Sequence, residues 1–216
     1  MKPTVWESTL EEFREQVASR RPVPASGSVS AVSASLALNL LVKVLEITAH
    51  KKGFAADPGR LGTLLEAAKA ESARLERYAD EDVAAFNAYL QSAKLPQSND
   101  AERGRRQQAT ASCLQQVIEG PFQAARSAAA GIGICADALP LVPKSLIADL
   151  GSAVALLAGA ARGLMVSAEF NIRQLAGGAK AFHQLTAQLE GLGREVSERE
   201  NSVGRQVAAM IAEENQ

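Results

Sequence analysis

The chain has 216 residues, 47% of them hydrophobic, so it can bury a substantial core, and with no linker-like segment we expect one domain over residues 1–216. Its formal net charge of −1, from 23 basic and 24 acidic residues scattered along the chain, argues against a nucleic-acid-binding protein. The two cysteines, Cys113 and Cys135, form no CxxC motif, and the N-terminus has no apolar signal core; both features favour a reducing, cytoplasmic setting.

Helical patterns dominate the sequence, because aromatic residues make up only 4% of the chain and no alternating β-branched run occurs. We therefore expect an all-α fold, a single-domain bundle of long helices. The first helix begins after Thr9 with a capping box completed by Glu12, and it ends near Pro22. It places three apolar residues on one face: Leu10, Phe13 and Val17.

Residues 22–28, Pro-Val-Pro-Ala-Ser-Gly-Ser, form a loop before the second helix, which is expected over 29–50 with Ser28 as its cap. The free N–H groups at such a helix N-terminus favour an anionic or carbonyl oxygen, so this loop is the best candidate for a ligand-contacting edge. An ordinary loop, cap and buried helix is the alternative. The uncharged run 22–42 contains five serines, an asparagine and two prolines, so we expect no membrane-spanning helix.

Three proline-bounded helices and a final amphipathic segment follow, over about residues 58–95, 100–139, 145–175 and 185–210. The helix over 100–139 is expected to be interrupted at Gly120-Pro121, because proline lacks the N–H group that an interior helical residue donates. Gly177-Gly178 separates the final segment from the helix before it. Small residues crowd the second and fifth helices, which lets helix axes approach closely within one subunit or against a second subunit.

An aspartate lies on the apolar face of the third helix. Counting by three and four residues from Leu61 reaches Asp82, with Tyr78 and Phe86 one turn away on either side, whereas Asp80 lies about 200° around the helix and is expected to face solvent. Partial desolvation would suit Asp82 to hold and donate a proton near neutral pH. A structural carboxylate that accepts hydrogen bonds from another helix N-terminus or from an arginine is an equal alternative.

Other chemistries have little support in the sequence. His50 and His183 are far apart and belong to no metal-binding spacing, so no metal site is expected. Walker, Rossmann and GxSxG motifs are also missing, so no nucleotide cofactor or serine nucleophile is expected. The pair Lys51-Lys52 at the end of the second helix is most often a solvated helix terminus.

Several of these features occur in the same order in a known family. They are the loop 22–29, Lys51-Lys52 before Gly53-Phe54, the run 80–86 followed by Leu95-Pro96, Asp149, and Phe170-Asn171. Together they resemble the formiminotransferase-cyclodeaminase C-terminal domain and its stand-alone relatives, the methenyltetrahydrofolate cyclohydrolases. The resemblance covers nearly the whole chain and implies an all-helical homodimer with a folate site in a cleft near the subunit interface.

The resemblance implies one of two reactions. In the cyclodeaminase reaction, N10 of 5-formiminotetrahydrofolate attacks the formimino carbon and ammonia leaves. In the cyclohydrolase reaction, water opens the methenyl bridge of 5,10-methenyltetrahydrofolate. The folate is the substrate in both, so no separate cofactor is implied. A separate formiminotransferase is an implied partner, since no transferase domain fits in this chain.

The resemblance also implies roles for individual residues. Asp82 would be the proton donor, and the other positions would bind substrate: Gly27 and Ser28 near the pterin or one-carbon unit, Lys51 and Lys52 at the glutamate carboxylates, and Asp149 and Asn171 at the pterin edge.

The sequence departs from the family pattern at three places. The family's Pro-Gly-Gly-Gly-Ser reads Pro-Ala-Ser-Gly-Ser here, with Ala25 and Ser26 in place of two glycines. An Asn/Ser-Asp motif is reduced to Asp149 after an apolar run, and a second asparagine expected after Asn171 is Leu175. A non-catalytic or ligand-shifted helical dimer that binds a folate-like molecule or a protein partner is therefore the alternative function.

Overall fold

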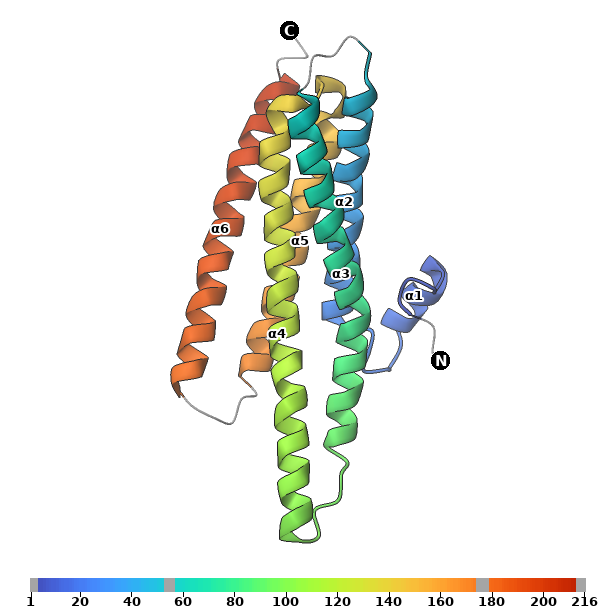
Figure 1. The fold of residues 1–216 in the computed structure, drawn as a ribbon, viewed down its shortest axis with the longest axis vertical. Helices are drawn as coiled ribbons and strands as arrows, with labels where there is room; N and C mark the ends of the chain where they lie inside the picture. Colours follow the sequence, from blue (N-terminus) through green and yellow to red (C-terminus); the bar gives the residue numbers. More distant parts are fainter. Residues whose placement is uncertain (1–3, 53–56, 174–178, 213–216) are drawn as a thin grey trace.

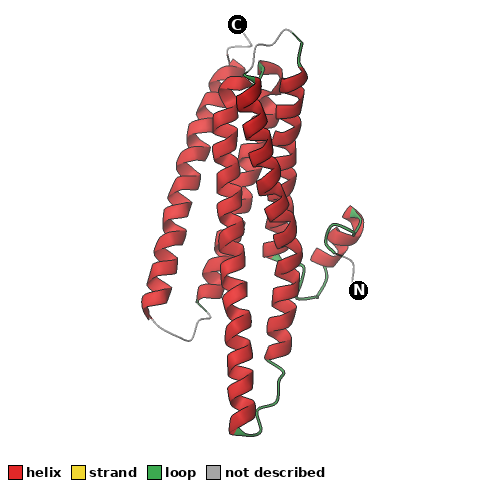
Figure 2. Ribbon diagram, viewed as in Figure 1, coloured by secondary structure: helices red, strands yellow, loops and turns green. Residues whose placement is uncertain are grey.

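The computed structural model describes residues 4–52, 57–173 and 179–212 of the chain, and in these ranges it contains α-helices and short 3-10 turns but no strand (Figures 1 and 2). The elements are α1 (Leu10–Val17), α2 (Ser26–His50), α3 (Pro58–Ser92), α4 (Asp100–Ala138), the 3-10 turns η1 (Leu139–Leu141) and η2 (Lys144–Leu146), α5 (Ile147–Ile172) and α6 (Ala179–Ala212). The predicted all-α bundle of long helices is confirmed. The predicted end of the fifth helix at Leu175 and the predicted separator Gly177-Gly178 lie outside the described residues.

Four long helices, α2 to α5, form an antiparallel bundle in which each helix packs on its neighbour in the chain and α5 closes the ring against α2. The helix α6 packs along α5 and α4, while the short α1 lies at the side of the bundle and packs Phe13 against its core (Figure 1). Close approach at small residues is evident inside the core. A Cβ atom on Gly131 would lie 2.9 Å from the Leu38 side chain, and one on Gly163 would lie 2.5 Å from the Ser30 hydroxyl. Part of the small-residue pattern is therefore explained by packing within one subunit.

Two helices begin at residues whose side chains suit a helix start. At α1, the Thr9 side chain and Glu12 form the predicted capping box. At α3, Asp57 accepts hydrogen bonds from the first turn and Pro58 occupies the first helical position. The cap of α2 differs from the prediction, because the helix begins at Ser26 with Ala25 as its N-cap and no side-chain cap. Ser28 therefore lies inside the first turn, where its hydroxyl is free for another partner.

The N-terminal segment contacts α3 before α1 begins. The Val5 amide donates to Asp80 Oδ1 at 2.6 Å, and the Trp6 indole N–H donates to the Glu76 carbonyl at 2.9 Å. Asp80 is half-buried as a result, so the prediction that it faces solvent is wrong. Helical periodicity cannot reveal this contact, because the segment that covers Asp80 is distant in sequence.

The helix α4 runs without interruption through Gly120-Pro121, so the predicted break is also wrong. Proline at position 121 removes the N–H that would bond to the carbonyl four residues earlier, which belongs to Val117. That carbonyl instead accepts a hydrogen bond from the Asn171 side-chain amide at 2.8 Å. An amide on α5 thus replaces the missing donor, and the helix continues.

Candidate functional site

The Asp82 carboxylate lies at the N-terminus of α2 and accepts two side-chain hydrogen bonds. The Ser28 hydroxyl donates to Oδ2 at 2.7 Å, and the Tyr78 hydroxyl donates to Oδ1 at 3.1 Å. Asp82 itself is half-buried, whereas both donors are buried. The two donors fix both oxygens of the carboxylate, and the uncapped helix N-terminus beside it favours negative charge.

Gly27 allows the carboxylate to approach α2 so closely. A Cβ atom at this position would lie 2.4 Å from Asp82 Oδ1 and 2.8 Å from Oδ2, closer than side-chain atoms pack. The carboxylate therefore occupies the space that any other side chain at position 27 would fill. The structure brings together Gly27, Ser28 and Asp82, three of the residues to which the family resemblance implies a role.

Tyr78 is a neighbour of Asp82 that the sequence pattern does not single out, because helical spacing marks it only as an apolar residue one turn away, whereas its hydroxyl donates to the carboxylate. Burial, and after it the negative charge and hydrogen bond of Asp82, raise the pKa of the Tyr78 phenol, so it remains a donor at neutral pH. Gly120 on α4 makes room for its ring, because a Cβ there would lie 2.8 Å from Tyr78 Cε2. The spacing of Tyr and Asp at i and i+4 was the available signal.

A cleft of about 1040 Å³ runs between α3 and α4 and reaches Asp82. Tyr78 lines it from α3, while Gly120, Pro121 and Ala124 line it from α4. Its volume lies at the upper end of the range of small-molecule sites. A carboxylate on the wall of such a cleft can accept a proton from a bound molecule and return it to another atom of that molecule.

Asn171 borders this region through its hydrogen bond to Val117, which lines the cleft. The side-chain amide nitrogen is engaged with the carbonyl freed by Pro121. Its amide therefore stabilises α4 in this structure.

The other predicted binding residues lie at the far end of the bundle. Gly27 and Lys51 are separated by nearly the whole length of α2, about 36 Å at 1.5 Å per residue. Lys51 donates to the Ser145 hydroxyl at 3.4 Å, and exposed Lys52 follows it. Asp149 forms an ion pair with Lys43 at 3.0 Å. Within this chain, the structure does not bring Lys51, Lys52 or Asp149 to Asp82.

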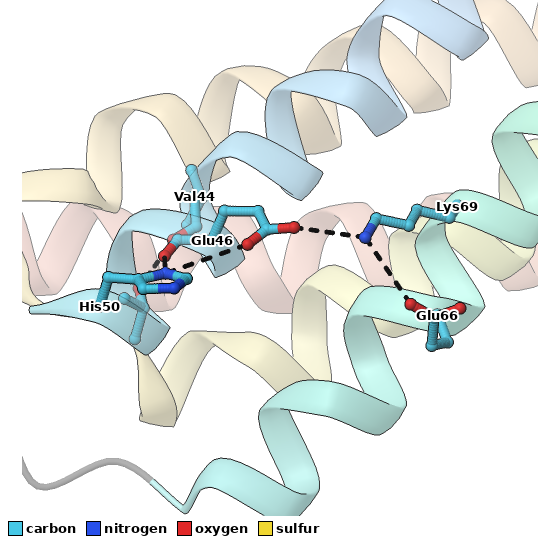
Figure 3. Close-up of polar contacts among 6 residues, drawn as sticks. Val44, Glu46, His50, Glu66 and Lys69 are labelled. Carbon is cyan, nitrogen blue, oxygen red and sulfur yellow. Dashed lines mark hydrogen bonds and ion pairs between the residues drawn. The ribbon is translucent and has the colours of Figure 1, made fainter.

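Figure 3 shows a polar network near this far end of α2. Lys69 of α3 lies between Glu46 of α2 at 3.2 Å and Glu66 at 3.6 Å, and the His50 ring nitrogen Nδ1 lies 2.9 Å from the Glu46 carbonyl oxygen. These groups are substantially exposed, and their pairing joins α2 to α3. Nothing in this network requires a ligand. Within the described ranges, no group of three or more His, Cys, Asp or Glu side chains is arranged to hold a metal ion.

Comparisons with known proteins identify relatives of this chain. A family model described as formiminotransferase-cyclodeaminase matches residues 9–190. The chain is 32% identical over 120 residues to the formimidoyltransferase-cyclodeaminase of Sus scrofa, covering 56% of this chain and 22% of that protein. It is 26% identical over 184 residues to the methenyltetrahydrofolate cyclohydrolase of Methylorubrum extorquens, covering 85% of this chain and 88% of that protein.

The fold is also found in a solved structure. The formiminotetrahydrofolate cyclodeaminase of Thermotoga maritima superposes with a TM-score of 0.83 and 20% sequence identity, covering 96% of this chain and 99% of that one. The chain thus spans about a fifth of the length of the Sus scrofa protein but nearly all of the bacterial chains.

Proposed function

This chain belongs to the formiminotransferase-cyclodeaminase family, and we propose that it is a folate one-carbon enzyme, either a formimidoyltetrahydrofolate cyclodeaminase or a methenyltetrahydrofolate cyclohydrolase. The observation that carries the proposal is the Asp82 carboxylate, held by Ser28 and Tyr78 on the wall of a cleft large enough for a folate.

Both reactions pass through a tetrahedral carbon and need a group that moves protons around it. In the cyclodeaminase reaction, N10 bonds to the carbon of the protonated formimino group, whose carbon–nitrogen double bond becomes single. Asp82 takes the proton that N10 loses and gives it to the former formimino nitrogen, which departs as ammonia while the methenyl double bond forms. In the cyclohydrolase reaction, water adds to the methenyl carbon and Asp82 takes one of its protons. Asp82 gives this proton to N5 as the bond between that carbon and N5 breaks, and the remaining hydroxyl proton is released to solvent as the formyl carbonyl forms. Ser28 and Tyr78 orient the carboxylate in each case.

A spectrophotometric assay with both substrates tests the proposal. The methenyl absorbance band should grow when 5-formiminotetrahydrofolate is cyclised, or decay when 5,10-methenyltetrahydrofolate is hydrolysed. A cyclodeaminase also requires a reaction that transfers a formimino group to tetrahydrofolate, and a separate formiminotransferase is the proposed partner for this step. Binding of folate in a calorimeter without turnover of either substrate would favour the non-catalytic alternative.

Ala25 and Ser26, which replace two glycines of the family loop, are compatible with catalysis. Ala25 adopts an extended conformation with φ −132° and ψ −158°, and Ser26 is the first residue of α2, so neither position needs the freedom of glycine. The Ser26 hydroxyl also forms a hydrogen bond with the Ser167 hydroxyl at 2.8 Å. The glycine that Asp82 requires for its close approach, Gly27, is present.

The proposal includes a homodimer formed through the outer face of α2 and α5. Large apolar side chains are exposed along both helices: Leu36 (55%) and Ile47 (42%) on α2, and Leu156 (50%) and Phe170 (64%) on α5. By length and hydropathy both helices would also pass for membrane spans, as core helices of bundles do. A second copy packed on this face would cover the apolar side chains, which supports a dimer rather than a lipid contact.

An antiparallel dimer would also explain the separated family positions. If a twofold axis crosses α2 near its middle, the Lys51 end of one helix lies beside the Gly27 end of the other. Light scattering on a sizing column without detergent should give twice the 22.7 kDa chain mass. Phe170→Glu should shift the protein toward a monomer, whereas a monomeric parent protein at micromolar concentration would contradict the dimer.

A further inference from the structure

The charges that line the α3–α4 cleft are segregated along its length. Glu81, Asp82 and Glu119 lie toward the end that meets the α2 N-terminus. The three arginines of the cleft, Arg74, Arg77 and Arg126, lie toward the other end, together with Glu71, which pairs with Arg74. The cleft is therefore acidic at the Asp82 end. Its other end carries Arg77 and Arg126 in addition to the Arg74–Glu71 ion pair.

The helix register fixes this polarity. Arg77 precedes Asp82 by about five residues, or roughly 7.5 Å along α3. Tyr78 lies against Gly120 across the cleft, and because α3 and α4 are antiparallel, Arg126 is displaced from Gly120 toward the start of α3 by about 9 Å. Both arginines are thus offset from Asp82 in the same direction.

Arg77 and Arg126 are available to a ligand. Arg74 has a carboxylate partner in Glu71, but neither Arg77 nor Arg126 makes an ion pair or a hydrogen bond within the described part of the chain. Arg126 instead lies over the Phe122 ring, with its guanidinium carbon 5.3 Å from the ring centroid, which limits its motion. Two unpaired guanidinium groups on one cleft form a ready site for carboxylates.

We propose that the cleft binds folate in one orientation, with the one-carbon bridge at Asp82 and the carboxylates of the first glutamate on Arg77 and Arg126. This inference rests on the proposed function. The methenyl bridge shares a positive charge between N5 and N10, and a protonated formimino group carries the same charge, while the glutamate carries two negative charges. The charge order of the ligand therefore matches the charge order of the cleft.

The wall of the cleft between its acidic and basic ends suits the aminobenzoyl ring of the folate, which joins the pterin to the glutamate. Gly120, Pro121 and Ala124 provide a small and mostly apolar wall there, against which the flat aminobenzoyl ring can lie. Lys51 and Lys52 cannot serve this tail within the same subunit, because they lie at the opposite end of α2. Lys51 and Lys52 could bind the glutamate of the folate only if it extended out of the α3–α4 cleft toward a partner subunit.

The test compares ligands with and without the glutamate. We would measure KM and kcat of Arg77→Gln, Arg126→Gln and the double variant for whichever folate the parent protein converts, the 5-formimino or the 5,10-methenyl form, and for the corresponding tetrahydropteroate, which lacks glutamate. Each single change should raise KM for the glutamylated ligand about fivefold, less so at high salt, and leave kcat and the pteroate KM nearly unchanged. Arg105→Gln, an exposed arginine of α4 outside the cleft, is the matched control and should change neither KM.

Four results would overturn the inference. Equal weakening of both ligands would assign the arginines to folding or to the pterin end. A glutamate-selective loss in a Lys51→Gln/Lys52→Gln variant, with the arginine variants unaffected, would place the tail at the lysines. If the parent protein neither binds nor converts 5-formiminotetrahydrofolate or 5,10-methenyltetrahydrofolate, the proposed function fails together with this inference. If the parent protein turns over normally and the arginine variants keep the parent KM for the glutamylated ligand, the inference alone is refuted.

Discussion

Substitution of Gly27 by alanine tests whether the position of the Asp82 carboxylate controls the reaction. The new Cβ atom would lie 2.4 Å from Oδ1 and 2.7 Å from Cγ, whereas ordinary van der Waals contact begins at 3.4 Å. The carboxylate must therefore move by about 1 Å or rotate away. Either movement lengthens the hydrogen bonds from Ser28 and Tyr78, which are 2.7 and 3.1 Å long.

The expected effects on stability and on turnover differ in size. Weakening two hydrogen bonds to a charged group costs about 1–3 kcal/mol, and replacement of glycine by alanine in a helix returns about 0.5–1 kcal/mol, so the melting temperature should fall only modestly. A displacement of about 1 Å at a catalytic group lowers turnover by roughly 10²-fold. Turnover should therefore decline much more than stability.

The assay is the change in methenyl absorbance, measured alongside a thermal melt. Gly62→Ala is the matched control, because Gly62 lies on the exposed side of α3 and a Cβ atom added there would have no neighbour within 4 Å. This control should keep full turnover and gain slight stability. Full turnover in Gly27→Ala, with the added methyl verified by mass spectrometry, would refute the reasoning that Asp82 must hold its present position.

Two further predictions concern side chains that the structure places in defined contacts. Asp82→Asn keeps the shape of the side chain but cannot transfer a proton, so turnover should fall by roughly 10²–10⁴ with folding nearly intact. The control Asp80→Asn should leave turnover nearly unchanged. Normal turnover with a sharply lower melting temperature in Asp82→Asn would show that this carboxylate is structural. Asn171→Ala leaves the Val117 carbonyl without its donor and should cost about 1–3 kcal/mol in chemical denaturation. In a Pro121→Ala background, which restores a backbone N–H, the same change should cost clearly less, and an equal cost in both backgrounds would contradict the compensation.

The hydrogen bonds that would hold Asp82 in place for proton transfer are also those expected of a purely structural carboxylate. A carboxylate at an uncapped helix N-terminus, with two hydroxyl donors, stabilises the junction of α2 and α3 whether or not it transfers protons. Its position on a large cleft is the feature that a purely structural role does not require. Turnover and stability must therefore be measured on the same variants.

The sequence by itself determined the features that depend on local chemistry. Proline positions and capping residues, such as Asp57 before Pro58, defined the long helices, because these signals act within one turn of the chain. The helical period was sufficient to place Asp82 on the inner face of α3, since a carboxylate's face depends only on its spacing from apolar neighbours. The family resemblance also followed from the order of short motifs along the chain.

Only the tertiary structure decided which of those motifs meet. The continuity of α4 through Pro121 depends on the Asn171 amide from another helix, and the burial of Asp80 depends on the Val5 amide. The order of motifs did not reveal that Lys51 lies a full helix length from Asp82, because a motif's position in the chain does not specify its end of an antiparallel bundle. The charge order of the cleft likewise arises only when α3 and α4 pack in register, since contacts between distant segments are set by packing and not by local spacing.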